Sequence, residues 1–397
     1  MSRLDSATSA LLREFRRDLH AHPELRFTEV RTAAKLAERL GALGLDVETG
    51  VAETGVVARL TTGRPGPHVL VRADMDALPT ADLKSADYAS TYDGISHACG
   101  HDVHTTVVLG IAEVLCRQAP SCGAVTFVFQ PAEEIPFGEA SGGAAVVATG
   151  LLDDVDVVLG LHCWPALPAG TIGVDGTTAM ASKKAFRIAM RGIGAHAATP
   201  SHGRDAVLAA SSLVVHLNQL LGREMDPGER AALNVGTITG GRSQSIVAPS
   251  AEITGTIRTV DSALSTRLRD AVDRVAAGTA HTFGVEATVE WKNDMPPVVN
   301  DAELVHRALA VLQTNPSIEV ELLDAPPMTA DDFALYAQER PGLYVKLGVK
   351  SGDGSLGGHP LHDGRFDVDE SSIDVGVLGL TALIDDLMSN GWGKRAS

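Results

Sequence analysis

The spacing of apolar residues divides the first 161 residues into alternating helices and strands. Helical spacing predicts helices over residues 1–22, 28–43, 103–117 and 142–151. Short apolar runs predict strands over residues 55–60, 68–72, 124–129 and 155–161. The last of these runs is almost uninterrupted, which is typical of a strand buried on both faces. Strands that alternate with helices indicate βαβ units and a mostly parallel sheet.

The pattern changes near residue 180. The order strand, helix, strand, strand, helix, strand is predicted over residues 184–190, 205–221, 233–239, 253–260, 262–283 and 286–291. This β-α-β-β-α-β order is the split, ferredoxin-like unit. After this unit the alternation of helices and strands returns, with helices predicted over 301–313, 331–338 and 369–388 and a strand over 342–349. We therefore expect an α/β catalytic domain (residues 1–180 and 293–397), with a mostly parallel sheet, interrupted by an inserted α+β ferredoxin-like domain (181–292).

Composition narrows the class of protein. The 397 residues carry 33 basic and 50 acidic side chains, a formal net charge of −17, which argues against nucleic acid or an anionic membrane as the main partner. Four scattered cysteines do not suggest a disulfide framework at this length. The N-terminus lacks the apolar core of a signal peptide, and no apolar run is long enough to span a bilayer. We expect an acidic, cytoplasmic enzyme that acts on a small molecule.

Potential metal ligands are concentrated between His97 and His104, in His97-Ala-Cys99-Gly-His101-Asp102-Val-His104. Imidazole and thiolate are the side chains that bind Zn²⁺ and related cations. Gly100 would allow Cys99 and His101 to turn toward one point. A dense group of histidines and cysteine has little structural use without a metal.

Acidic residues and a further histidine follow three of the predicted strands. Asp74 and Asp76 follow one strand, Glu133 and Glu134 follow another, and His162 directly follows the run at 155–161, where we expect it to close the strand. Active sites of open α/β sheets form at the carboxyl ends of the strands. One carboxylate of an adjacent pair can bind metal while the other transfers protons. Together these residues predict a two-metal hydrolytic site.

The chain resembles the M20 metallopeptidase and amidohydrolase family, most closely the subgroup of hippurate hydrolases, N-acyl-amino-acid deacylases and plant auxin-conjugate hydrolases. The resemblance covers essentially the whole chain. It rests on several motifs in the same order: Leu19-His-Ala-His-Pro-Glu24, Asp74-Met-Asp-Ala-Leu-Pro79, His97-Ala-Cys-Gly-His-Asp102, Phe129-Gln-Pro-Ala-Glu-Glu134, Gly160-Leu-His-Cys-Trp-Pro165, Ala195-His-Ala-Ala-Thr-Pro200, Gly255-Thr-Ile-Arg258, Asp332-Phe333, and Leu361-His362 followed by Phe366.

The resemblance implies a role for particular residues. Five would hold two divalent metal ions: Cys99, His101, Glu134, His162 and His362. Glu133 would be the general base, Asp76 would support the metals, and His196 would steady the developing oxyanion. Arg258 is a candidate contact for the substrate carboxylate, and Ser245 stands where the family usually has a substrate-binding Asn. Zn²⁺, Mn²⁺, Ni²⁺ and Co²⁺ all suit these ligands.

The activity that we expect is hydrolysis of an N-acyl amino acid to a carboxylic acid and a free amino acid, as in an aminoacylase. A dipeptidase or carboxypeptidase with the same site is the main alternative. A cysteine hydrolase with Cys99 as nucleophile and His101 or His104 as base, and a non-catalytic metal-binding protein, are further alternatives. The exposed edges of a four-stranded inserted sheet could pair across a two-fold axis, so we expect a homodimer. The resemblance implies the same association, with His196 acting at the partner's metals.

Overall fold

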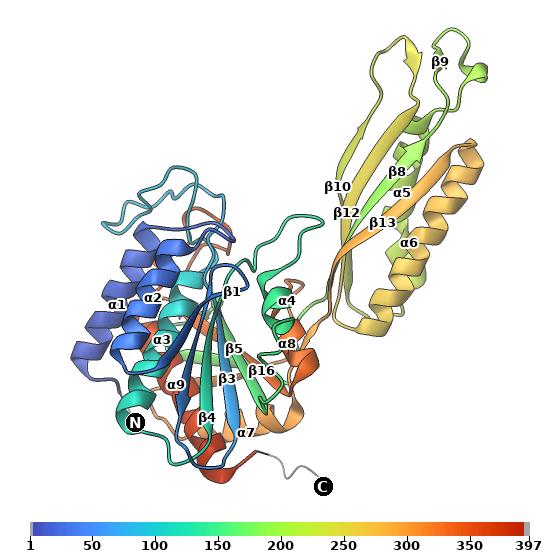
Figure 1. Cartoon of the computed structure of the whole chain (residues 1–397). Helices are drawn as coiled ribbons and strands as arrows, with labels where there is room; N and C mark the ends of the chain where they lie inside the picture. Colours follow the sequence, from blue (N-terminus) through green and yellow to red (C-terminus); the bar gives the residue numbers. More distant parts are fainter. Residues whose placement is uncertain (1–2, 393–397) are drawn as a thin grey trace.

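The computed structural model describes residues 3–392. Residues 1 and 2 of the predicted first helix, and residues 393–397 of the predicted catalytic domain, lie outside the described part. Figure 1 shows an α/β part that contains the first and the last described helix, and an elongated part that projects from it. Among residues 3–392, no helix combines the length and the apolar character that crossing a bilayer requires. All four cysteines are free.

The α/β part is built from segments on both sides of the insertion. The segments before it are α1 (Ser6–Ala21), α2 (Val30–Ala42), β1 (Asp46–Val51), β2 (Gly55–Thr61), β3 (His68–Asp74), α3 (His101–Gln118), β4 (Ala124–Gln130), α4 (Gly142–Val147), β5 (Val157–Pro168), β6 (Thr171–Asp175) and β7 (Thr178–Met180). The segments after it are β14 (Val298–Val299), α7 (Ala302–Leu312), β15 (Glu319–Leu323), α8 (Phe333–Glu339), β16 (Gly342–Lys350) and α9 (Ser371–Asn390).

The main sheet has the strand order β1-β2-β4-β3-β5-β16-β6-β15. Its centre, β4-β3-β5-β16, is parallel, which confirms the predicted mainly parallel sheet. β1 and β2 pair antiparallel at one edge, and β6 is antiparallel to β16. β1, β6 and β15 were not predicted: β1 and β15 are largely exposed, so they lack an apolar pattern, and β6 is short.

Helices cover both faces of this sheet. Val69 and Val71 of β3 belong to the core shared with α1, α2, α3, α7 and α9, whereas Leu70 packs with Phe333 and Tyr336 of α8 on the opposite face. Successive residues of a strand point to opposite faces, so a strand between two helical layers is apolar throughout. This arrangement leaves the carboxyl ends of the parallel strands as the open edge of the layer.

The projecting part contains the insertion: β8 (Lys183–Arg191), β9 (Ala195–His196), the 3₁₀ turn η1 (Pro200–His202), α5 (Ala206–Glu224), β10 (Ala231–Gly240), β11 (Ile246–Val247), β12 (Ser250–Thr259), α6 (Ser262–Phe283) and β13 (Glu286–Met295). Its antiparallel sheet has the order β10-β12-β8-β13, as a ferredoxin-like unit requires. Asp205 and Asp261 cap the two helices by accepting backbone N–H bonds. Phe186, Ile188 and Met190 of β8 pack beneath those helices. β13 continues past residue 292, the predicted end of the insertion.

Candidate functional site

The candidate site lies where β3 and β4 end and α3 begins. β3 ends at Asp74, Glu133 and Glu134 follow the end of β4, and His101 is the first residue of α3. The prediction that His162 closes its strand is wrong: β5 continues to Pro168, and His162 pairs with Lys346 of β16 in mid-strand. His162 interrupts the apolar run because its side chain lines the cleft, as that of Trp164 does, although the backbone pairing of β5 continues.

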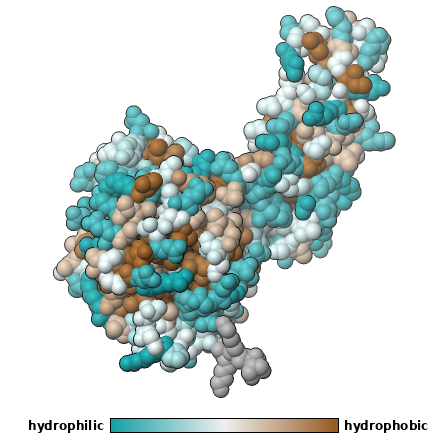
Figure 2. Space-filling model, in the orientation of Figure 1, coloured by the Kyte–Doolittle hydropathy of each residue, from teal (hydrophilic) through white to brown (hydrophobic). Residues whose placement is uncertain are grey.

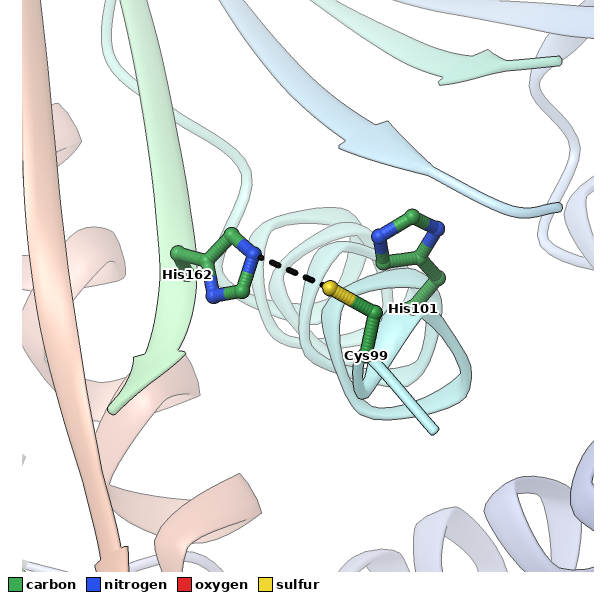
Figure 3. A group of neighbouring side chains, drawn as sticks. All are labelled: Cys99, His101 and His162. Atoms are coloured by element: carbon green, nitrogen blue, oxygen red, sulfur yellow. Dashed lines mark hydrogen bonds between the residues drawn. The ribbon is translucent and has the colours of Figure 1, made fainter. Parts of the chain in front are cut away.

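Cys99, His101 and His162 converge on one point, from the start of α3 and from β5 (Figure 3). Sγ of Cys99 is 3.5 Å from Nε2 of His162. Gly100 makes the approach possible, because its φ is +85° and a Cβ there would lie 3.0 Å from Sγ of Cys163. All three side chains of the group are buried.

Hydrogen bonds fix which nitrogen of each buried histidine faces this point. Nδ1 of His101 donates to the carbonyl oxygen of Asp76 (2.9 Å), and Nδ1 of His162 donates to that of Cys163 (2.8 Å). Nε2 of each ring therefore faces the group: that of His162 lies 3.5 Å from Sγ of Cys99, and that of His101 is buried with no hydrogen-bond partner among the described residues. Burial, with the neighbouring His104, lowers the pKa of His162 to about 4, which keeps the ring neutral. A neutral imidazole oriented in this way is suited to bind a metal.

A second group shares Cys99 with the first. Cys99, Glu134 and His362 place one donor atom each within 4.8 Å of one another, and Nε2 of His362 lies 2.9 Å from Oε1 of Glu134. His362 lies on a loop with φ +68°, and its N–H donates to the carbonyl of Ala98. The structure thus brings all five predicted ligands together in two overlapping triplets. The thiol, imidazole and carboxylate donors fit two divalent cations of the zinc type.

Asp76 organises the loop that carries the two glutamates. Its Oδ1 accepts the N–H of Glu133 and its Oδ2 accepts the N–H of Glu134, both at 3.0 Å. Nδ1 of His101 is also 3.3 Å from Oδ1 of Asp76. One buried carboxylate therefore positions the predicted base, one predicted ligand on the same loop and a ligand on α3.

A second buried carboxylate, Asp74, positions His104. Oδ1 of Asp74 accepts a bond from Nδ1 of His104 (2.7 Å), whose Nε2 accepts the N–H of Cys163 (2.8 Å). Both ring nitrogens are occupied, so His104 is not placed to take a proton from Cys99, as one cysteine-hydrolase hypothesis requires. Arg72 holds the other oxygen of Asp74 and also bonds Asp332.

The environment gives the adjacent glutamates different proton affinities. Burial and the neighbouring Glu134 raise the pKa of Glu133 well above its usual value. Burial also opposes ionisation of Glu134, but the hydrogen bond from His362 and the charges of His101 and Lys183 lower its pKa. Glu133 is the better proton acceptor and Glu134 the better ligand. Burial raises the pKa of Cys99, so its thiolate needs a cation beside it.

These residues face a cleft of about 360 Å³ between the two parts of the chain. Part of its wall is apolar and is formed by Met180, Met295, Met328, Leu361 and Trp164. Arg258 lines the cleft, as its predicted substrate role requires. Lys183 also lines it, although the sequence had not singled it out, because two lysines at the start of a strand carry no distinctive signal.

The structure does not bring His196 and Ser245 into this cleft. His196 is exposed on β9, at the end of the insertion farthest from the main sheet (Figure 1). Ser245 lies beside it, since its carbonyl accepts the N–H of Ala197 at 3.0 Å. Two predicted site residues are thus adjacent to each other and remote from their own chain's metal ligands.

Glu29 is a buried residue near the site that the sequence reasoning missed. Its Oε1 accepts the N–H of Ala132, next to Glu133, and its Oε2 accepts the hydroxyl of Thr54. Ala132 has φ +51°, so this bond helps to hold a strained turn. No sequence motif marks a lone glutamate before a helix as part of a site.

Most of the chain matches a known family of hydrolases. The model of peptidase family M20/M25/M40 matches residues 70–386, and the chain belongs to that family of hydrolases. It is 35% identical over 360 residues to the N-acetyl-L-cysteine deacetylase of Bacillus subtilis (90% of this chain, 83% of the relative). It is 31% identical over 369 residues to thermostable carboxypeptidase 2 of Saccharolobus solfataricus (92% of each). The solved structure of the Bacillus subtilis YXEP protein, described as a dinuclear metal binding peptidase from the M20 family, matches with a TM-score of 0.82 at 32% identity (97% of this chain, 99% of that one).

Proposed function

We propose that this protein is a metal-dependent amidohydrolase that cleaves N-acyl amino acids of the acetyl or benzoyl type to a carboxylic acid and a free amino acid. The observation that carries the proposal is the pair of ligand triplets that share Cys99, with the carboxyl of Glu133 beside them. The similarity to a deacetylase of an N-acetyl amino acid supports this substrate class.

Each residue has a defined part in the proposed reaction. Two divalent cations (Zn²⁺, Mn²⁺, Ni²⁺ or Co²⁺), held by Cys99, His101, Glu134, His162 and His362, would lower the pKa of water and polarise the amide carbonyl. Glu133 accepts a proton from the attacking water and delivers it to the leaving nitrogen. Asp76 keeps Glu133 in position, and Arg258 binds the α-carboxylate of the substrate.

The proposal includes a homodimer in which His196 acts at the partner's site. Its distance from its own cleft supports this assignment, and Ser245 would reach the partner's substrate with it. Leu208 and Val215 on α5 and Ile238 on the edge strand β10 are large apolar residues about half exposed. Figure 2 shows isolated hydrophobic residues among hydrophilic ones on the face of the insertion that is in view. A second copy that packs on α5 and β10 would cover Leu208, Val215 and Ile238 and pair the edge strand.

Complementation tests the exchange of His196. A Glu133→Gln chain is mixed with a His196→Ala chain, each nearly inactive alone. If His196 acts on the partner, each mixed dimer regains one complete site. Subunit exchange demonstrated by mass spectrometry without recovered activity would contradict the assignment.

A dipeptidase or carboxypeptidase is the second candidate, favoured by the 31% identity to a thermostable carboxypeptidase. Arg258 would serve either activity, because both substrates present a free carboxylate. A panel of N-acetyl amino acids, N-benzoyl amino acids and dipeptides, assayed with Mn²⁺ or Zn²⁺, separates the two. We expect the N-acyl amino acids to have the higher kcat/KM, and a reversed order would replace the first proposal with the second.

A further inference from the structure

Two cationic side chains lie opposite each other at the end of the inserted sheet that borders the cleft. Lys183 is the first residue of β8, and Arg258 is near the end of β12. The strands pair Ile257 with Lys184, and the N–H of Ser182 donates to the carbonyl of Thr259 at 2.7 Å. This register sets Arg258 directly opposite Lys183, and both line the cleft with Glu133 and Glu134.

In the described part of the chain, neither cation forms an ion pair, although Glu134 interacts electrostatically with both and Glu133 with Arg258. Within residues 3–392, the side chain of Lys183 makes no hydrogen bond or ion pair, and that of Arg258 makes one bond, from Nη1 to the carbonyl of Met328 (2.9 Å). The adjacent Lys184 differs, because it forms an ion pair with Asp294. Like charges on opposite residues of an antiparallel pair destabilise a sheet, and two bound metal ions would make the cleft still more positive. An anionic ligand would relieve this repulsion.

We propose that Lys183 and Arg258 together form a two-carboxylate subsite, and that the preferred substrate is an N-acyl amino acid with an acidic side chain. This inference rests on the proposed function. The guanidinium of Arg258 binds the α-carboxylate as a fork, and the ammonium of Lys183 binds the side-chain carboxylate as a point charge. Opposite residues of a strand pair have Cβ atoms only about 5 Å apart. Two carboxylates on the same amino acid suit this spacing and leave the apolar wall for the acyl group.

The test compares two substrates of nearly the same shape, N-acetyl-L-glutamate and N-acetyl-L-glutamine, on the metal-loaded full-length protein. We expect kcat/KM to favour glutamate at least tenfold. Lys183→Met should reduce this glutamate-to-glutamine ratio about 10–100-fold, mainly through KM, because a charge-assisted hydrogen bond is lost. Lys183→Arg should restore most of the ratio.

Lys184→Met is the matched control, since it removes the same charge from the next residue, outside the cleft, and should leave the ratio unchanged. Lys183→Gln replaces the methionine variant if that chain does not fold. The inference is overturned if wild type does not favour glutamate, or if Lys183→Met lowers both substrates equally. Preference for N-succinyl-L-alanine, whose second carboxylate is on the acyl group, would also overturn it. Cleavage of dipeptides with no turnover of any N-acyl amino acid would instead contradict the proposed function itself.

Discussion

Asp76→Asn removes one charge and one acceptor from the carboxylate that holds the Glu133–Glu134 loop. Asparagine keeps a single acceptor oxygen, so its amide group must face either the N–H of Glu133 or that of Glu134, both now bonded at 3.0 Å. One charge-assisted bond is lost and one buried N–H is left unpaired, which should lower the free energy of unfolding by about 1–3 kcal/mol.

The same change should affect metal binding and turnover. Residues that position metal ligands typically alter metal affinity or activity about 10–100-fold when replaced. We therefore expect both the metal affinity and kcat/KM for N-acetyl-L-methionine to fall by about that factor. Metal titration, urea unfolding and steady-state kinetics measure the three effects.

Asp301→Asn is the matched control, because Asp301 also accepts two backbone N–H bonds, at the start of α7, outside the cleft. Asparagine is a good helix cap, so its unfolding free energy should change by less than about 1 kcal/mol. An Asp76→Asn protein with wild-type metal affinity and with kcat/KM within threefold of wild type would refute the positioning role of Asp76.

Two further predictions concern Cys99 and Glu29. Alkylation of Cys99 should be slow in the metal-loaded protein and fast after chelation, because a ligated thiolate is protected; equal rates, measured by mass spectrometry, would argue against ligation. Burial raises the pKa of Glu29 from 4.5 to about 7. The folded chain therefore keeps this proton to a higher pH than the unfolded chain, and the stability of wild type falls as the pH rises from 4.5 to 7. Glu29→Gln should thus gain stability relative to wild type across that window, by up to about 3 kcal/mol, in denaturant unfolding at several pH values. A constant difference between pH 4 and pH 8 would contradict the assigned pKa.

The sequence predicted those features that depend on local pattern. The apolar runs before Asp74 and Glu133 located both residues at strand ends, and the βαββαβ order predicted the inserted sheet. The exposed edge strand β1 carries no apolar pattern, and the extent of β5 beyond His162 depends on pairing with β16, so neither could be read from spacing.

Residues whose surroundings come from distant segments were harder to predict. Lys183 lines the cleft together with Glu133 and Glu134, which follow a strand of the main sheet, and no local pattern encodes this long-range placement. The position of His196 relative to its own cleft depends on the length and direction of the insertion. Its motif could suggest a role but not the site at which it acts.

In the proposed reaction, Glu133 moves the proton at a two-metal site that hydrolyses N-acyl amino acids. The most direct measurement is turnover of N-acetyl-L-methionine by wild type and Glu133→Gln, each loaded with Mn²⁺ or Zn²⁺, with the metal content of both proteins determined. We expect two metal ions per subunit in both proteins and a loss of about 10²–10⁴-fold in kcat for the variant. A variant that retains its metals and turns over within threefold of wild type would contradict it.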